Sequence, residues 1–246
     1  MHEWYAAPME GLTGWRWRQV QHEMFGRAAL YVTPFVSPNG NFSFQRKELE
    51  ELDPERNRGI PVVPQILTNR AEYFVWAAKE CRSRGWAQVD LNLGCPSGTV
   101  TGKKKGAGLL RQPELLRQLL DGIFDALPDM KISVKTRIGW ERAEEWPALL
   151  ALLETYPICR LTVHPRVRTQ FYKGTADREV FRWTAEHTAL PLCYNGDVTT
   201  VRDLWEMGEA FPDDAVMVGR GLVADPSLLR QATGGPAASL EELREF

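Results

Sequence analysis

The sequence lacks several features that mark whole classes of protein. It has four cysteines in 246 residues, and no two of them form a CxxC pair. Disulfide scaffolds and structural zinc sites are therefore not expected, and we predict no metal site. Neither a signal-like segment nor an apolar run of about 18 residues is present, so we expect a cytoplasmic protein that does not associate with membranes.

A strong excess of charge of one sign is also missing. The formal net charge is −2, which argues against a general nucleic-acid coat protein. With 43% hydrophobic and 25% charged residues, the composition is that of a globular domain. No GxGxxG motif follows the first apolar run, which weakens the case for an open dinucleotide-binding sheet.

What the sequence does contain is a repeated strand pattern. Short β-like runs lie at residues 3–9, 29–35, 60–67, 87–94, 131–139, 159–166, 190–197 and 215–221. Between most of them the apolar residues follow a helical period, as in residues 71–81 and 115–127, and Pro113 is well placed to open the second of these helices. Strands that alternate with helices predict a parallel sheet, and eight of them predict a closed α/β fold, the (β/α)₈ TIM barrel.

Polar and small residues gather where these predicted strands end. In a TIM barrel the carboxyl ends of the strands carry the chemistry. We therefore expect the following residues to share one rim of the barrel: Pro8, Met9, Gln65, Asn92, Cys95, Lys135, Arg137, His164, Arg166, Asn195, Gly196, Asp197, Gly219, Arg220 and Gly221.

The last two strand ends indicate a phosphate site. "YNGD" and "VGRG" contain glycine, which allows a close approach of the backbone to an anion, and Arg220 can add a charged contact. A flat ring over the barrel mouth would then meet Met9, Gln65, Lys135 and His164. Amide and cationic donors of this kind stabilise the negative charge of a reduced flavin, so a phosphorylated flavin is the favoured ligand.

The ordered set "APMEGLT", "VDLNLGCPSGTV", "GAGLL", "VKTRIG", "VHPRVRTQFYKGTAD", "YNGDV" and "MVGRG" closely resembles the tRNA-dihydrouridine synthase family of FMN-dependent barrels. The resemblance runs from about Pro8 to Gly221. It implies that NADPH reduces FMN, that the reduced flavin gives hydride to C6 of a uracil, and that an acid protonates C5.

The same resemblance assigns roles to single residues. Cys95 is the implied acid, and Asn92 helps to orient the uracil. A neutral thiol suits this role, because its ordinary pKa of about 8.5 keeps the proton in place near neutrality. The implied FMN contacts are Pro8, Met9, Gln65, Lys135, His164, Asn195, Gly196, Asp197, Gly219 and Arg220.

The end of the sequence departs from the family, whose members continue into a C-terminal helical domain that grips tRNA. We expect residues 1–233 to form the FMN-binding barrel. Residues 234–246 would form a hinge and one short helix, a remnant of that domain or a substitute for it, with Ser239 and Glu242 as a capping box. Either the barrel alone or a second subunit then recognises the RNA, or the substrate is not tRNA.

Charge near the expected rim favours an RNA substrate. The segment from Gly94 to Gln112 contains four basic residues and no acidic one. A positive rim on an otherwise acidic body suits a polyanion. The expected substrate contacts are Asn92, Lys103, Lys104, Lys105, Arg137, Arg166 and Arg168.

Two other functions remain open at this point. An FMN-dependent ene-reductase would act on a small activated alkene or a free pyrimidine, and a noncatalytic RNA-binding barrel would use the rim without chemistry. The uridine position, the class of RNA, the choice between NADPH and NADH, and the oligomeric state are all left open by the sequence.

Overall fold

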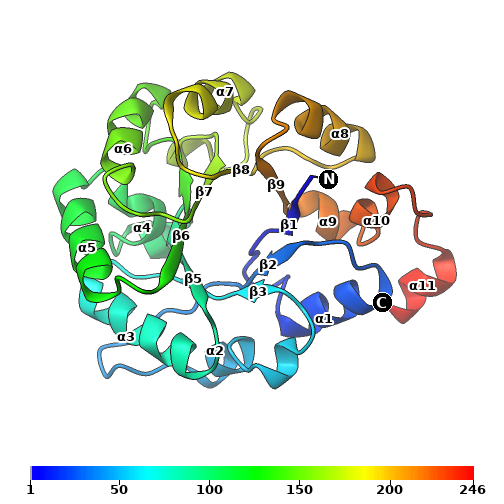
Figure 1. The fold of residues 1–246 in the computed structure, drawn as a ribbon, viewed down its shortest axis with the longest axis horizontal. Helices are drawn as coiled ribbons and strands as arrows, with labels where there is room; N and C mark the ends of the chain where they lie inside the picture. The colour runs from blue at the N-terminus through cyan, green and yellow to red at the C-terminus, as the bar shows by residue number, and fades with distance from the viewer. Residues whose placement is uncertain (1) are drawn as a thin grey trace.

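The computed structural model describes residues 2–246 and shows a parallel β-barrel surrounded by helices (Figure 1). The strand order is β3-β2-β1-β9-β8-β7-β6-β5-β4, and every pairing is parallel. The bounds are β1 Trp4–Ala6, β2 Leu30–Val32, β3 Val62–Val63, β4 Gln65–Ile66, β5 Gln88–Leu93, β6 Lys131–Arg137, β7 Arg160–His164, β8 Leu192–Tyr194 and β9 Ala215–Val218. The TIM barrel predicted from the sequence is confirmed.

The third predicted strand is divided in two by Pro64. β3 pairs with β2, and β4 pairs with β5, so the two halves join the ends of the sheet and close the barrel. Proline has no N–H to donate to a strand neighbour, which interrupts the pairing at this residue. Its carbonyl oxygen still accepts a hydrogen bond from the Asp90 N–H at 2.8 Å, so the barrel wall continues past the break.

The helices cover the outside of the barrel in chain order. The two helices expected from periodicity are confirmed as α3 and α5, and Phe74, Cys81, Leu116 and Leu120 of their apolar stripes are fully buried. The bounds are α1 Trp15–Met24, α2 Arg46–Glu51, α3 Ala71–Ser83, α4 Gly98–Thr101, α5 Pro113–Ala126, α6 Trp146–Leu153, α7 Arg178–His187, α8 Val201–Ala210, α9 Arg220–Ala224, α10 Leu228–Ala232 and α11 Leu240–Glu245. Within residues 2–246, no helix has the length and apolar character that a membrane span requires.

The barrel interior has an apolar half and a polar half. On the β1, β2, β8 and β9 side, a separate apolar cluster is formed by Tyr5, Ala7, Val32, Cys193, Ala215 and Met217. On the β4 to β7 side, the buried inward-facing groups are polar, and they include Gln65, Asp90, Asn92, Ser133 and His164. Burying polar groups costs free energy unless they are hydrogen-bonded, so the polar half needs a dense hydrogen-bond network.

The terminal segment packs back onto the barrel. The capping box predicted for Ser239 and Glu242 is present at the start of α11. Arg230 of α10 donates to both carboxylate oxygens of Glu242, at 2.7 and 3.1 Å, and the Phe246 ring lies 5.6 Å from the ring of Phe25. α11 therefore lies outside the ring of helices, beside α10 and α1 (Figure 1).

Candidate functional site

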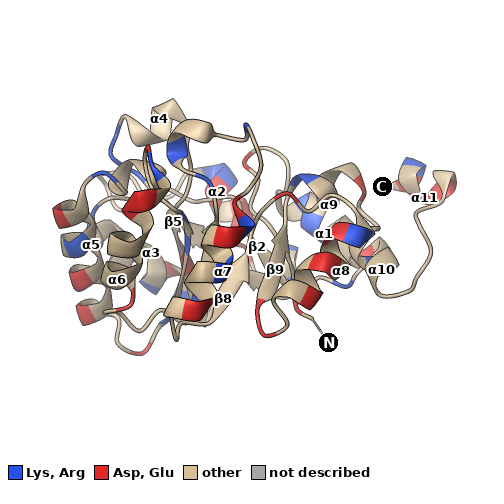
Figure 2. Ribbon diagram, turned by 90° about the horizontal axis from the view of Figure 1, so that it is seen from above, with Lys and Arg blue, Asp and Glu red and all other residues tan. Residues whose placement is uncertain are grey.

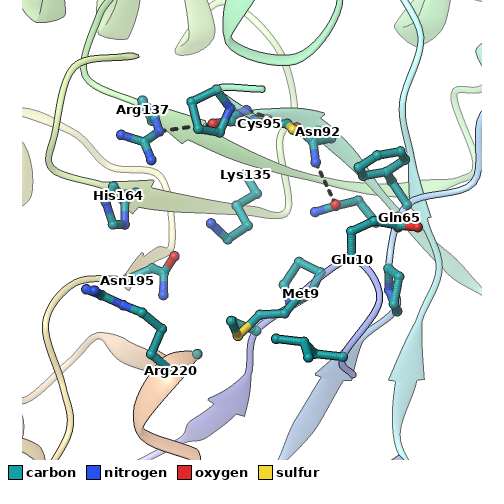
Figure 3. Close-up of a pocket in the computed structure, with 18 of the residues that line it drawn as sticks. Met9, Glu10, Gln65, Asn92, Cys95, Lys135, Arg137, His164, Asn195 and Arg220 are labelled. Atoms are coloured by element: carbon teal, nitrogen blue, oxygen red, sulfur yellow. Dashed lines mark hydrogen bonds between the residues drawn. The ribbon is translucent and has the colours of Figure 1, made fainter. Parts of the chain in front are cut away.

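A cavity of about 280 Å³ opens at the carboxyl ends of the strands (Figure 3). Twelve of its lining residues are among those predicted from the sequence. These are Pro8, Met9, Gln65, Asn92, Cys95, Lys135, Arg137, His164, Asn195, Gly196, Gly219 and Arg220. Residues separated by more than 200 positions thus meet in one site, as the barrel topology requires.

The loop after β1 supplies one wall of the cavity. The Thr13 hydroxyl accepts a hydrogen bond from the Met9 N–H at 2.8 Å and donates to the Ala7 carbonyl oxygen at 3.3 Å. Gly11 adopts a φ of 78°, which a side chain would disfavour. This tight turn holds the Met9 side chain at the cavity.

The turn after β5 presents the Cys95 thiol. The Asn92 side-chain oxygen accepts hydrogen bonds from the N–H groups of Gly94 (3.1 Å) and Cys95 (2.9 Å). Arg137 Nε donates to the Gly94 carbonyl oxygen at 3.0 Å. Gly106 closes the same turn from behind, where a Cβ would lie 2.9 Å from the Cys95 carbonyl oxygen. The thiol is therefore held at a fixed place on the cavity wall.

Burial raises the pKa of the Cys95 thiol, although the nearby Ser97 N–H and the charges of Arg137 and Lys135 act in the opposite direction. A raised pKa keeps the proton on sulfur at neutral pH. Burial also raises the pKa values of the Cys81 and Cys193 thiols, but both residues are fully buried and neither lines the cavity. Cys95 is thus the thiol that lines the site.

The floor of the cavity is cationic. Burial, with the neighbouring Arg137 charge, lowers the pKa of Lys135 to about 8, and Asp90 partly offsets this. Burial and the charges of Lys135, Arg137 and Arg166 lower the pKa of His164 far below its ordinary value, so the imidazole is neutral. The site therefore combines a cation with neutral donors, an arrangement suited to ring oxygens and nitrogens that carry partial negative charge.

Tyr172 covers part of the cavity mouth. Its ring lies 5.1 Å from the Arg220 guanidinium carbon, 5.6 Å from that of Arg137 and 6.2 Å from the His164 ring. The residue before it, Phe171, has a positive φ of 50°, which is unfavourable for a bulky side chain. Tyr172 is not among the residues predicted from the sequence. Its signal was its place in "VHPRVRTQFYKGTAD", one of the motifs that carry the family resemblance.

Arg220 stands at the end of β9 and is held by Asp197. Asp197 Oδ1 accepts from Arg220 at 2.7 Å, while Oδ2 accepts from the Ala176 N–H at 2.9 Å and from Arg166. These contacts lower the pKa of Asp197 against the opposing effect of its burial. Asp197 does not line the cavity, but it contacts the lining residue Arg220 directly and His164 through Arg166.

Several predicted substrate contacts lie outside the cavity. Arg166 is 1% exposed and donates to the carbonyl oxygens of Lys173 and Gly174, so its charge is used inside the protein. Arg168 packs against the Trp140 ring at 4.7 Å and donates to the Pro96 carbonyl oxygen at 3.1 Å. Both residues brace the rim from beneath.

The lysine run lies on the loop beside α4. Lys103 and Lys104 are exposed, whereas the Lys105 ammonium donates to the Ser37 hydroxyl at 3.0 Å. Figure 2 shows Lys and Arg residues around α4 and several acidic residues on α5, whereas α7 carries residues of both signs. Lys103 and Lys104 are thus exposed cations beside α4.

Other lining residues were not identified as site residues from the sequence: Ala7, Glu10, Leu12, Pro34, Phe35, Gly94, Pro96 and Tyr172. Glu10 pairs with Lys47 at 2.9 Å, so its charge is balanced at the rim. Asp90, beneath the cavity, was also missed. Its signal was visible as one charged residue in the otherwise apolar centre of "QVDLNL".

The family model of the dihydrouridine synthases (Dus) matches residues 5–242. The chain belongs to the dihydrouridine synthase family. It is therefore an enzyme of the oxidoreductase class, and the resemblance seen in the sequence is confirmed.

Curated relatives agree with this assignment. The chain is 30% identical over 226 residues to a probable tRNA-dihydrouridine synthase of Rickettsia conorii. The aligned residues cover 92% of this chain and 67% of the relative. It is 33% identical over 221 residues to a protein of the same description from Rhizobium leguminosarum bv. phaseoli, with 89% and 68% covered. tRNA-dihydrouridine synthase B of Proteus vulgaris is 30% identical over 227 residues, with 92% and 69% covered. The chain thus spans about two thirds of the length of these relatives.

Solved structures show the same fold at much lower identity. Histamine dehydrogenase from Rhizobium sp. 4-9 superposes with a TM-score of 0.70 at 13% identity, covering 94% of this chain and 45% of that chain. A variant of NCR from Zymomonas mobilis superposes with a TM-score of 0.66 at 15% identity, covering 96% and 87%. At such identities the likeness supports the barrel fold alone.

Proposed function

We propose that this protein reduces uridine to 5,6-dihydrouridine in RNA, with tRNA as the substrate, FMN as the cofactor and NADPH as the reductant. Membership of the family supports the class of reaction. The observation that carries the proposal is the position of Cys95, a protonated thiol on a braced turn, in the same cavity as Lys135. The protein would carry out this reaction in the cytoplasm.

The residues present fit a flavin mononucleotide. Three cations line the cavity, Lys135, Arg137 and Arg220, against the single carboxylate of Glu10. The residues that would hold FMN are Pro8, Met9, Gln65, Lys135, His164, Asn195, Gly196, Gly219 and Arg220, with Asp197 acting through Arg220. When bound, FMN supplies the hydride that NADPH has provided. Arg220 would pair with the phosphate, and Lys135 would stabilise negative charge on the ring.

Cys95 would deliver the proton. Uracil reduction needs a proton at C5 as negative charge develops there, and a thiol that ionised early would have lost it. Burial keeps the Cys95 proton on sulfur, and the Asn92 contact fixes the direction from which it is presented. Asn92 would also orient the uracil, and Arg137 would complete the substrate side of the cavity.

RNA would approach across the loop that carries α4. Lys103 and Lys104 are exposed there, and the Arg168 guanidinium donates to the hydroxyl of Thr101, the last residue of α4, at 3.3 Å. Cations on one rim of an otherwise acidic barrel would attract the phosphate backbone. We further propose that the catalytic barrel extends to residue 233 and that residues 234–246 are its short terminal hinge and helix.

Two observations test this function. The purified protein should show the yellow absorption spectrum of bound flavin, and its absence would favour a noncatalytic RNA-binding barrel. Mass-spectrometric mapping of RNA from a strain that lacks the gene should show a missing dihydrouridine that returns when the gene is restored. An unchanged modification pattern would favour an ene-reductase for small alkenes or free pyrimidines.

A further inference from the structure

A line of buried polar side chains runs beneath the cavity along the inner faces of β4, β5 and β6. Gln65 is fully buried, and Asp90, Asn92 and Ser133 are 2%, 7% and 5% exposed. Asp90 has no direct contact with the cavity and plays no part in the proposed chemistry. Burying a carboxylate costs free energy of folding unless hydrogen bonds or charges compensate it, so the contacts of Asp90 need an explanation.

The contacts form one continuous chain of hydrogen bonds. Asp90 accepts from the Ser133 hydroxyl at 2.7 Å and from Gln65 Nε2 at 2.8 Å. Gln65 Oε1 accepts from Asn92 Nδ2 at 2.7 Å, the contact drawn between their side chains in Figure 3. The side-chain oxygen of Asn92 then accepts from the Cys95 N–H at 2.9 Å.

The donor-to-acceptor direction of this series of hydrogen bonds is fixed at both ends. A carboxylate can only accept, so the Gln65 nitrogen must face Asp90 and the Gln65 oxygen must face Asn92. A backbone N–H can only donate, so the Asn92 oxygen must face the Cys95 turn. Neither amide can rotate to exchange its oxygen and nitrogen without placing two donors or two acceptors against each other.

The same orientation decides what the amides offer to a ligand. Gln65 and Asn92 both line the cavity, and each amide nitrogen has a second N–H for which residues 2–246 provide no hydrogen-bond partner. With Asp90 as the acceptor, this wall of the cavity presents nitrogen donors. If both side-chain amides were reversed, this wall would present oxygen acceptors to a ligand that is itself rich in acceptors.

We propose that Asp90 is a positioning residue that acts through Gln65 and Asn92 to hold the Cys95 turn and to keep both amide donors directed at the ligand. The proposal rests on the proposed function for its effect on catalysis, but its geometric part concerns this chain alone. We call the hydrogen-bonded series Asp90, Gln65, Asn92 and Cys95 the Asp90 relay.

The surroundings of Asp90 allow its side chain to be an ionised carboxylate, which can only accept hydrogen bonds. Burial raises the pKa of Asp90 to about 6, while the hydrogen bonds from Ser133 and Gln65 and the Lys135 charge oppose the rise. Near pH 7.5 the group is therefore largely ionised. The other titratable group coupled to it, Cys159, is a thiol whose pKa burial raises to about 11, so it stays neutral.

The first experiment measures the Cys95 turn without cofactor turnover or RNA. Asp90→Asn should let the two amides reverse and should loosen the turn. We expect alkylation of Cys95 by iodoacetamide, followed by peptide mass spectrometry, to become about fivefold faster, the effect of one lost hydrogen bond on an opening equilibrium. Recording the rate across pH separates a change in accessibility from a change in the thiol pKa.

A matched control and a rescue make this test specific. Ser133→Ala removes the other hydrogen bond of Asp90 and leaves the relay intact, so its Cys95 rate should match wild type. Asp90→Asn combined with Gln65→Glu moves the carboxylate one link along. The amide introduced at position 90 could then donate to the new carboxylate, which still accepts from Asn92, so the slow rate should return.

The second experiment follows the two half-reactions in the holoenzyme. In Asp90→Asn, oxidation of the reduced flavin by uridine-containing RNA should slow by up to about 100-fold, as expected for a misplaced reacting group. Reduction of the flavin by NADPH should slow far less, because it does not use the thiol. If neither the wild type nor any variant forms dihydrouridine, the proposed function is wrong. The alkylation experiment still tests the Asp90 relay, because it requires neither flavin turnover nor RNA.

Two results would overturn the relay. One is a wild-type alkylation profile in Asp90→Asn, and the other is a double variant that remains as fast as the single variant. Should Asp90→Asn fail to fold, Gln65→Met breaks the same relay one link later, and a wild-type Cys95 rate in that protein would equally contradict the proposal.

Discussion

The two halves of the barrel interior follow opposite rules. On the β1, β2, β8 and β9 side, Tyr5, Val32, Cys193 and Met217 pack as a hydrophobic core does. On the β4 to β7 side, the equivalent space is filled by amides, a carboxylate, a lysine and an imidazole. The barrel needs only the first kind of interior to be stable, because apolar burial is what favours folding.

The polar half therefore exists at a cost in stability. Burial raises the pKa of Asp90 and lowers the pKa values of Lys135 and His164, so it favours the neutral form of each group. Water would solvate the charged forms better. Perturbed groups of this kind gather at functional sites. The comparison teaches that one half of the barrel interior is packed for stability, whereas the other half carries the polar groups at and beneath the cavity. Substitutions inside each half should separate the two.

The largest effect is expected for Cys95, at the edge of the polar half. Cys95→Ala should reduce uracil reduction by about 10²- to 10⁴-fold, the usual contribution of a positioned acid. The protein should keep its flavin and its reduction by NADPH. Single-turnover kinetics of both half-reactions provide the measurement, and undiminished formation of dihydrouridine by the variant would rule out Cys95 as the proton donor.

Lys135 should give the polar half a pH dependence. Its pKa of about 8 means that the ammonium is charged below pH 8 and becomes neutral as the pH rises through that value. Affinity for FMN should therefore fall above pH 8, and Lys135→Gln should bind more weakly, by about 1.5–3 kcal/mol for one charged contact, with no fall near pH 8. A titration of FMN fluorescence between pH 6.5 and 9.5 measures both.

His164 serves as the internal comparison in the same titration. Its pKa lies far below neutrality, so the imidazole is neutral throughout this range. His164→Asn should therefore leave the shape of this titration unchanged, because any step near pH 6 comes from the Asp90 carboxyl, whose pKa is about 6, or from the FMN phosphate. A step present in wild type and absent in His164→Asn would contradict a neutral His164.

A smaller effect, on stability rather than activity, is expected in the apolar half. Cys193→Ser places a hydroxyl in the cluster with Tyr5, Val32 and Met217, where Cys193 is fully buried. The free energy of unfolding should fall by about 1–3 kcal/mol, the cost of burying a poorly paired polar group. Urea denaturation measures this change. Dihydrouridine formation per folded molecule should be unchanged, and a selective loss of activity would place Cys193 in the chemistry.

The smallest effect concerns the rim outside both halves. Changing Lys103, Lys104 and Lys105 to glutamine should weaken RNA binding and reduce the slope of affinity against salt by up to about 0.9 for each lost duplex contact. Lys105 should contribute least, because it is bonded to Ser37. Lys131, exposed at the start of β6 and thus at the opposite end of the barrel, is the matched control. Equal slopes for wild type and the triple variant would remove this loop from RNA binding.

Much of this arrangement could be predicted from the sequence, since strand ends and helical stripes are local signals. The eight strands and the twelve cavity residues followed from apolar runs that end in polar groups. The contacts of Arg166 could not be predicted in this way. Its partner Asp197 lies in the loop after the next strand, 31 positions away, and the pairing leaves Arg166 buried instead of at the surface.

The same reason explains why Asp90 and Tyr172 were missed. The role of Asp90 depends on Gln65, which lies 25 positions earlier on the neighbouring strand, and no pattern within one strand reveals that contact. Tyr172 reaches the cavity because its loop folds back over Arg137 and Arg220. Side-chain chemistry at strand ends is readable from sequence, whereas pairing between strands and the path of loops are not.

The most direct test of the proposed reaction supplies the purified protein with FMN, NADPH and unmodified tRNA transcripts and then analyses the nucleosides by mass spectrometry. We predict a uridine that has gained two hydrogen atoms in the wild-type reaction, and little or none with Cys95→Ala. Flavin that is reduced by NADPH but never reoxidised by any tRNA, with no dihydrouridine formed by wild type, would contradict the proposed function.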